Sequence, residues 1–287
     1  MQSQKSFEKT ATGCLYLVPT PIGNLGDMTY RAVETLKQVD LIASEDTRNT
    51  QKLLNHFEIE TKQISFHEHN TAQRIPQLIE KMQAGTTIAQ VSDAGMPSIS
   101  DPGKELVAAC VAAQIAVVPL PGANAGLTGL IASGLVPQPF YFYGFLDRKN
   151  SLQVDELQAL KQHQETMIFY EAPHRLKKTI SNMASVFGDD HQVVLARELT
   201  KKYEEFIRGT LGEIKQWTQD TQIRGEFVIM VAGFDQVLSA SPEIALPINE
   251  QIDRLIEAGK PVNAAIKEVA KQNGLNRQDV YRDYHEL

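Results

Sequence analysis

The chain opens with an alternation of short apolar runs and longer amphipathic stretches. The apolar runs have the length and composition of buried strands. They cover residues 15–18, 40–44, 62–66, 87–91 and 115–119. Between the third and fourth runs, residues 71–84 place Ile75, Leu78, Ile79 and Met82 at helical spacing. Strands that alternate with helices in this way predict a mostly parallel sheet with helices on both faces.

The pattern changes after Gly134. Apolar and aromatic runs then follow one another with shorter links, at residues 140–145, 166–170, 192–200, 203–209 and 226–233. Such spacing predicts a mixed, partly antiparallel second sheet. Two helices are expected alongside it, over about residues 151–163 and 176–187.

The last part of the chain reads as a small helical appendage. Apolar residues recur at helical spacing through residues 248–287, with breaks at 259–261 and 273–275, which is compatible with a helix-turn-helix. The appendage is expected either to stabilise the second domain or to dock the protein on structured RNA.

The predicted fold class is therefore α/β, with two α/β domains, a cleft between them and a C-terminal helical domain. The expected divisions are a flexible tail over 1–12, an N-terminal α/β domain over 13–121, a second α/β domain over 122–238, and a linker with the helical domain over 239–287. A cleft between domains is a common place for a ligand.

Composition narrows the class of protein. The 287 residues carry a net charge of −7, which argues against a generally basic nucleic-acid coat but leaves room for a local basic face. The two cysteines, Cys14 and Cys110, lie in or beside apolar runs, as free thiols in a reducing compartment do. The first 12 residues have no apolar core of a signal peptide, and no apolar stretch is long enough for a membrane span. We expect a cytoplasmic protein.

The candidate chemistry centres on residues 91–103, which read Val-Ser-Asp-Ala-Gly-Met-Pro-Ser-Ile-Ser-Asp-Pro-Gly. A turn of this composition between a strand and a helix is where an open α/β sheet builds a ligand site. Gly95 permits close approach of a backbone to a ligand, and Asp93 and Asp101 supply acceptors. The alternative is an ordinary connecting loop in which Asp101 caps the following helix.

Other polar groups follow predicted strands. Residues 45–48, Glu-Asp-Thr-Arg, serve either as a helix cap or as part of a site. Glu171 and His174 come just after the run at 166–170. His67 and His69 alternate along a strand end, but no third or fourth ligand has a suitable spacing, so we expect no metal site.

Five motifs stand in order along the chain and carry a resemblance. They are Pro19-Thr-Pro-Ile-Gly-Asn24, Glu45-Asp-Thr-Arg48, Ser92-Asp-Ala-Gly95 with Ile99-Ser-Asp-Pro-Gly103, Tyr170-Glu-Ala-Pro-His-Arg175 and Arg197-Glu-Leu-Thr-Lys201. Over residues 14 to about 285, the chain resembles the ribosomal RNA small subunit methyltransferase I family, of the tetrapyrrole-methylase fold class. It departs from the family pattern at Met96, at residues 121–125 and at Asp147, where Thr, Pro-Gly-Pro-Ser-Ala and Pro are more usual.

The resemblance implies an S-adenosylmethionine-dependent 2′-O-methyltransferase that acts on a cytidine in the decoding region of small-subunit (16S) ribosomal RNA. It also implies a partner, the 30S particle, and a homodimer. The implied cofactor-binding residues are Pro21, Gly23, Asp93, Ala94, Gly95, Ser98, Ile99, Gly122, Ala123, Tyr143, Glu171 and Ala172.

The reaction class sets what the protein itself must supply. S-adenosylmethionine carries a reactive methyl group, so the protein must orient the ribose hydroxyl and help it to lose a proton. The predicted catalytic residues are Glu171, His174, Arg175 and Lys201. Two alternatives stay open: a methyltransferase acting on tetrapyrrole carbons, and a non-catalytic ribosome assembly factor.

Overall fold

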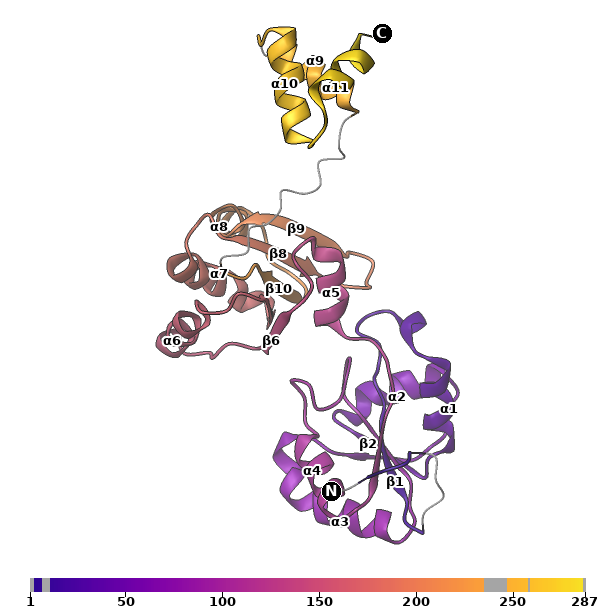
Figure 1. Cartoon of the computed structure of the whole chain (residues 1–287). Helices are drawn as coiled ribbons and strands as arrows, with labels where there is room; N and C mark the ends of the chain where they lie inside the picture. The colour runs from indigo at the N-terminus through magenta and orange to yellow at the C-terminus, as the bar shows by residue number, and fades with distance from the viewer. Residues whose placement is uncertain (1–2, 7–10, 235–246, 258, 286–287) are drawn as a thin grey trace. The chain divides into compact units, whose positions relative to one another are not determined.

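The computed structural model describes residues 3–6, 11–234, 247–257 and 259–285 (Figure 1). Half of the predicted tail and nearly all of the predicted linker therefore lie outside the described residues. The chain divides into two compact units, Met1–Gln236 and Val237–Leu287.

The first unit begins with a parallel five-stranded sheet of order β3-β2-β4-β1-β5. Its strands are β1 (Cys14–Leu17), β2 (Leu41–Ser44), β3 (Gln63–Ser65), β4 (Ile88–Val91) and β5 (Ala116–Pro119). Its helices are α1 (Tyr30–Gln38), α2 (Thr47–His56), α3 (Thr71–Gln83) and α4 (Lys104–Ala112), with 3₁₀ turns η1 (Leu25–Asp27) and η2 (Glu68–Asn70). The predicted parallel sheet is confirmed.

Helices cover both faces of this sheet, which explains why its strands are apolar runs and not alternating ones. Buried side chains of α1 and α2, such as Leu36 and Leu54, pack on one face. Leu78 of α3 and Leu106 of α4 pack on the other face. Asp46 caps α2, because its side chain accepts a hydrogen bond from the backbone N–H of Arg48.

A second five-stranded sheet follows, of order β6-β7-β10-β8-β9. Its strands are β6 (Phe140–Gly144), β7 (Thr166–Glu171), β8 (Gln192–Arg197), β9 (Glu205–Thr210) and β10 (Phe227–Val231). The pair β6–β7 is parallel and the other pairs are antiparallel, so the predicted mixed sheet is confirmed.

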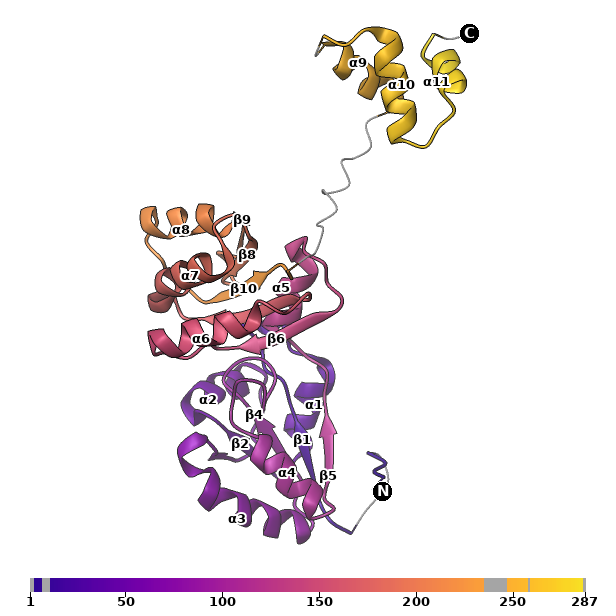
Figure 2. The same cartoon turned by 60° about the vertical axis from the view of Figure 1, so that its left-hand side comes forward.

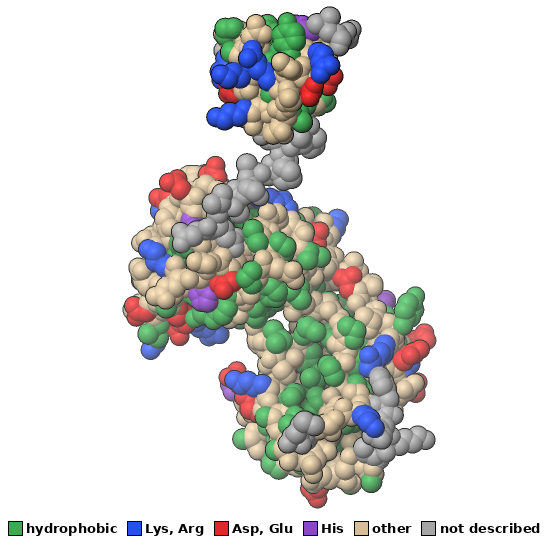
Figure 3. All heavy atoms as spheres, viewed as in Figure 1, with side chains coloured by type: hydrophobic (Ala, Val, Ile, Leu, Met, Phe, Trp, Pro, Cys, Tyr) green, Lys and Arg blue, Asp and Glu red, His purple; other side chains and the backbone are tan. Residues whose placement is uncertain are grey.

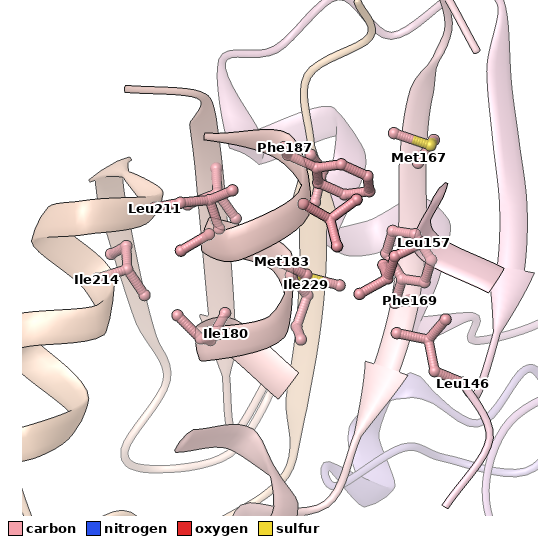
Figure 4. Close-up of a cluster of buried hydrophobic side chains, with 14 of the residues drawn as sticks. Leu146, Leu157, Met167, Phe169, Ile180, Met183, Phe187, Leu211, Ile214 and Ile229 are labelled. Carbon is pink, nitrogen blue, oxygen red and sulfur yellow. The ribbon is translucent and has the colours of Figure 1, made fainter. Parts of the chain in front are cut away.

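Four helices flank the second sheet: α5 (Ala125–Ser133), α6 (Asn150–Leu160), α7 (Pro173–Phe187) and α8 (Leu211–Asp220). A large apolar core joins α6, α7 and α8 to one face of the sheet, with Leu157, Ile180 and Ile214 among its members (Figure 4). Helix α5 lies on the opposite side in both views (Figures 1 and 2). A Cβ at Gly129 would lie 3.3 Å from the Met230 sulfur, so α5 approaches the sheet through its small residues.

Helix α8 is absent from the expectations above. Its start is nevertheless marked locally, by a capping box in which Thr210 and Glu213 bond to each other's backbone N–H groups. The apolar pattern of residues 211–220 is weak, because Leu211 and Ile214 are its only fully buried large apolar residues.

The second unit holds α9 (Ile248–Glu257), α10 (Val262–Gln272) and α11 (Arg277–Tyr284). They share a small core that includes Ile252, Ile266 and Val280, so the predicted helical appendage has an interior of its own. None of the described helices is long and apolar enough to cross a membrane. Both cysteines are free thiols, with Cys110 buried and Cys14 partly exposed.

Candidate functional site

A cavity of about 550 Å³ lies at the carboxyl ends of strands from both sheets of the first unit. The first sheet lines it with the segments that follow β1, β2, β4 and β5. The second sheet lines it with residues of or after β7 and β8, with Phe145 after β6, and with residues 226–228 at the start of β10. The titratable side chains that line it are Glu45, Asp93, Asp101, Tyr170, Glu171, His174 and Glu226. No Lys or Arg in the described part of the chain lines the cavity, so its charge is negative.

The β4–α4 loop, residues 92–103, supplies the wall from the first sheet. Ser98 and Ser100 have φ values of 71° and 61°, which side chains with a Cβ rarely adopt. Backbone strain of this kind persists only where the surroundings hold it, and it concentrates at functional sites.

The buried residue Gln90 of β4 holds the loop through a hydrogen bond. Its Nε2 donates a hydrogen bond of 2.7 Å to the Pro102 carbonyl oxygen. Gly103 has a φ of 142°, and a Cβ there would lie 2.1 Å from Gln90 Nε2 and 2.4 Å from Ser98 Oγ. Only glycine permits this packing, which holds the intervening Asp101 in the cavity.

Gly95 forms a bridge with Thr20, through hydrogen bonds of 2.9 and 3.0 Å between their backbones. Its φ is 80°, and a Cβ there would point toward Ile22 Cγ2 and the Ala123 carbonyl oxygen, at 3.4 and 3.7 Å. The β1 loop, the β4 loop and the segment before α5 thus meet at Gly95.

Two carboxylates beside this loop are held by backbone and amide donors. Asp93 accepts hydrogen bonds from the backbone of Asp46 and from the Asn49 amide. Glu45 accepts one from the backbone of Asp93 at 3.3 Å, and burial raises the pKa of Glu45.

Asp101 is different, because no backbone N–H of the described residues donates a hydrogen bond to its carboxyl group. Burial and the neighbouring charge of Glu45 raise its pKa to about 7, against a partial lowering by a hydrogen bond with Ser92. The alternative that Asp101 is a helix cap is wrong, since the N-cap of α4 is Gly103. Asp101 is therefore a half-buried acid in a cavity, poised to exchange a proton near neutral pH.

Glu171, by contrast, uses both of its carboxylate oxygens in bonds to neighbouring residues. Its Oε1 accepts from the Ala172 N–H at 2.8 Å and pairs with Arg175 Nε at 3.1 Å. Its Oε2 accepts from the Thr179 hydroxyl at 2.5 Å. Arg175 also donates to the carbonyl oxygens of Leu146 and Asp147. These bonds tie the start of α7 to the turn after β6, which favours a positioning role for Glu171 and Arg175.

Glu171→Gln is expected to lower the free energy of unfolding by about 3 kcal/mol, because it leaves Arg175 without its buried carboxylate. Urea unfolding at pH 7 measures this. Glu165→Gln is the matched control, because the Glu165 pair with His163 is more exposed and exposed pairs contribute little to stability. Equal losses in the two variants would contradict the assignment.

The structure brings together part of the predicted site. Seven predicted residues line the cavity: Asp93, Ala94, Gly95, Ile99, Glu171, Ala172 and His174. Pro21 and Gly23 line a smaller cavity of about 230 Å³ that shares Asp93. Ala123 approaches Gly95 through its carbonyl oxygen, and Ser98, within the β4–α4 loop, has a buried hydroxyl with no hydrogen-bond partner among the described residues.

The remaining predicted residues lie outside the cavity lining. Lys201 pairs with Glu198 and Glu226, each at 2.9 Å, and its side chain packs on Gly23. Gly122 packs on the Pro19 ring. Tyr143 packs against the core of the second sheet. Their assignments, like those of the residues that line the cavity, stay predictions.

Several residues that line the cavity were not among the predicted catalytic or cofactor-binding residues. Asp101 was weighed only as an acceptor or cap, and Tyr170 and Phe145 were not singled out. Tyr170 ends a strand within a matched motif, and Phe145 follows a glycine at the end of an aromatic run. Both signals were present in the sequence. Among the described residues, no group of three or more His, Cys, Asp or Glu side chains is arranged to hold a metal ion.

The two sheets and the cavity at the ends of their strands define an α/β protein with a small-molecule site. Residues 14–215 match the family described as Tetrapyrrole (Corrin/Porphyrin) Methylases. A solved structure of uroporphyrin-III C-methyl transferase from Thermus thermophilus, complexed with S-adenyl homocysteine, aligns with a TM-score of 0.55 at 15% identity, covering 77% of this chain and 97% of that one.

Relatives with higher sequence identity identify a particular family within this fold class. "Ribosomal RNA small subunit methyltransferase I" of Streptococcus pyogenes serotype M18 is 53% identical over all of both chains. The protein of the same name from Bacillus subtilis (strain 168) is 52% identical over 99% of each chain. The chain belongs to the ribosomal RNA small subunit methyltransferase I family.

Proposed function

We propose that this chain transfers the methyl group of S-adenosylmethionine to the 2′-oxygen of a cytidine ribose in the decoding region of small-subunit ribosomal RNA. The observation that carries the proposal is the acidic cavity with Asp101 at its wall, in a chain of this family. The proposed substrate is the 30S particle, which places the protein in the cytoplasm. S-adenosylmethionine is the proposed cofactor.

The residues present fit this cofactor. A sulfonium and an ammonium group are both cationic, and five carboxylates line the cavity (Glu45, Asp93, Asp101, Glu171 and Glu226). Gly95 leaves open the space that a side chain would fill. A volume of about 550 Å³ lies in the range of small-molecule sites, about 300–1,000 Å³. We assign the cofactor to the wall formed by Asp93, Ala94 and Gly95, with Ile99 and Ala123 beside it.

When bound, S-adenosylmethionine supplies an electrophilic methyl group and leaves as a neutral thioether. The protein's part is to orient the ribose hydroxyl and to accept its proton. We assign that proton to a carboxylate oxygen of Asp101. The hydroxyl O–H bond breaks, the proton moves to Asp101, and the 2′-oxygen becomes a better nucleophile.

Asp101 suits this role better than Glu171, Glu226 and Asp93, which also line the cavity. Both oxygens of Glu171 already accept hydrogen bonds, and Glu226 is paired with Lys201. Asp93 accepts two hydrogen bonds that join it to α2. A base is most effective when its pKa is near the working pH, as that of Asp101 is. His174 is exposed at the cavity and is the second candidate.

The test is incubation of the protein with cofactor radiolabelled in the methyl group and with isolated 30S subunits. Digestion of the RNA to nucleosides should release the label as 2′-O-methylcytidine. Label on a base would contradict the proposed reaction, and transfer to a tetrapyrrole in place of RNA would support the alternative enzyme. Cofactor binding without transfer to any substrate would support an assembly factor.

We further propose a homodimer formed through α5. The small residues of α5 face the sheet, while Leu127 and Ile131, four residues apart, are 46% and 80% exposed. Apolar side chains gather on the surface over this helix (Figure 3). An exposed apolar face of this kind marks an interaction site, and a two-fold dimer buries the same face twice.

Ile131→Glu is expected to convert the dimer to a monomer, because it would place two carboxylates in the proposed interface. Sedimentation velocity measures the mass. Leu152→Glu, on the exposed side of α6, is the matched control and should leave the mass unchanged. A wild-type protein that sediments as a monomer would overturn the proposal.

A further inference from the structure

Phe145 is an exposed aromatic side chain within the cavity. It lines the cavity and is nevertheless 51% exposed. An exposed phenylalanine buries little apolar area, so the fold gains little from it. Its position therefore indicates a ligand with an apolar or aromatic surface.

The backbone before Phe145 directs the ring toward the cavity. The pairing of β6 with β7 shifts register between Phe142 and Gly144, and Gly144 has a φ of 84°. Such irregularities re-aim a side chain at the end of a strand, often beside an active site. A Cβ at Gly144 would lie 3.3 Å from Ser100 Oγ, so this turn packs against the strained loop that carries Asp101.

A row of aromatic rings supports Phe145 from the second sheet. Its ring meets that of Tyr170 edge to face, with centroids 5.7 Å apart, and Tyr170 meets Phe142 in the same way at 5.1 Å. The Tyr170 hydroxyl accepts a hydrogen bond of 3.0 Å from the Gly126 N–H. Phe145 is thus held in place while half of its surface remains open.

The chemistry of the cavity identifies what covers this surface. The described lining holds five carboxyl groups, no Lys or Arg and one histidine, His174, so it is poorly suited to hold a phosphate. A nucleotide must therefore enter through its ribose and base. Proteins that recognise single-stranded RNA stack its splayed-out bases on aromatic side chains, and enzymes that modify a base also turn that base out of its stack.

We propose that Phe145 is the stacking surface for the nucleobase of the nucleotide whose ribose is methylated. The inference rests on the proposed function and assigns the base to a place in the site. It makes Phe145 a substrate-binding residue beside the loop of Asp101.

The test compares four variants in methyl transfer to 30S subunits. Phe145→Ala and Phe145→Leu should lower kcat/KM about 5- to 150-fold, the range for loss of one aromatic–base stack. Phe145→Trp should retain it, because the indole offers a larger stacking face. Phe140→Ala is the matched control. Phe140 begins β6, the strand that Phe145 follows, and it is 40% exposed but does not line the cavity.

Two measurements separate stacking from other roles. Titration calorimetry with S-adenosylmethionine should give the same affinity for Phe145→Ala and wild type; an equal loss of cofactor affinity would show that the ring contacts the cofactor and would overturn the inference. In Phe145→Trp, a cytidine-containing RNA oligonucleotide should quench the new indole. The chain has one native tryptophan, Trp217, which lies outside the cavity lining and provides the background signal.

The outcomes also separate this inference from the proposed function. If wild type transfers no methyl group to 30S subunits, the proposed function fails. If wild type is active and Phe145→Leu is equally active, the function stands and the stacking role fails.

Discussion

Replacing Asp101 by Asn is expected to slow methyl transfer strongly and, at the same time, to make the folded protein more stable at pH 8. The two effects have one cause. The cavity keeps an acid in surroundings that disfavour its charge, and the reaction uses that charge. Asn has nearly the same shape and cannot ionise, so it relieves the folded state while removing the proton acceptor.

The effect on rate follows from the loss of a positioned base, which is worth about 100- to 10,000-fold. Single-turnover rates with 30S subunits measure it. The wild-type rate should rise with pH and level off above about 7, where Asp101 is ionised. Asp101→Asn should be slow and lack this step. If the step persists in Asp101→Asn and disappears in His174→Gln, the base is His174.

The effect on stability has a defined pH window. The pKa of Asp101 is raised from an ordinary 3.8 to about 7 in the folded state, so the folded state binds the proton more tightly. Raising the pH through this window therefore lowers the stability of the wild type. Asp101→Asn has no such ionisation and does not lose stability in this way. The melting temperature of Asp101→Asn should therefore exceed that of wild type by an amount that grows from about pH 4 to pH 7 and then remains constant.

Asp40→Asn is the control of opposite sign. Hydrogen bonds from Thr87 lower the pKa of Asp40, so its ionised form stabilises the fold above the ordinary pKa. Asp40→Asn should therefore be less stable than wild type at pH 8, with the difference vanishing as the pH falls through the lowered pKa. If Asp101→Asn follows the same sign as Asp40→Asn, then Asp101 is a stabilising carboxylate and the assignment is wrong.

Gly95→Val is expected to weaken S-adenosylmethionine binding by about 100-fold, toward the upper end of the ~1–3 kcal/mol that overpacking costs. The Cβ would lie 3.4 Å from Ile22 Cγ2 and 3.7 Å from the Ala123 carbonyl oxygen. The free protein accommodates that atom, but the two γ-methyl groups beyond it would occupy the cofactor's place.

The positive φ of Gly95 adds a second effect, because a side chain there costs about 1–2 kcal/mol of stability. Gly85→Val isolates this strain. Gly85 has a φ of 99°, and a Cβ there would have its nearest neighbour 4.0 Å away. Titration calorimetry and thermal melts should show that both variants lose stability and that Gly95→Val alone loses affinity. Wild-type affinity in folded Gly95→Val would remove Gly95 from the cofactor site.

The hydrophobic pattern alone determined most of the fold. Residues 87–91 read as a buried strand because a parallel strand covered on both faces is mostly apolar, with Gln90 as the buried polar exception. Residues 71–84 read as a helix because one side of it faces the core. The same reasoning missed α8, whose buried side is narrow and whose start depends on a capping box. A pattern of apolar residues along the chain indicates burial and periodicity. It therefore predicts helices and strands that bury a broad face, and it does not predict a helix such as α8.

The motifs also placed the ligand-binding edge of the first sheet. Asp93 and Gly95 stand in a turn whose composition identifies it without any tertiary contact. What the turn's side chains do was decided only by tertiary structure. Gln90 and Gly103 hold Asp101 in the cavity, and Glu45, far away in sequence, is brought beside it by the pairing of β2 with β4.

The second sheet shows the same division. The sequence identified Glu171 as a polar group after a strand. Its bonds to Arg175 and Thr179 exist because α7 turns back over the strand that precedes it. Phe145 follows a register shift between Phe142 and Gly144, which depends on the pairing of β6 with β7. Spacing along the chain determines which elements form, whereas the acid–base and stacking chemistry depends on distances between residues that only the packing of the two sheets brings together.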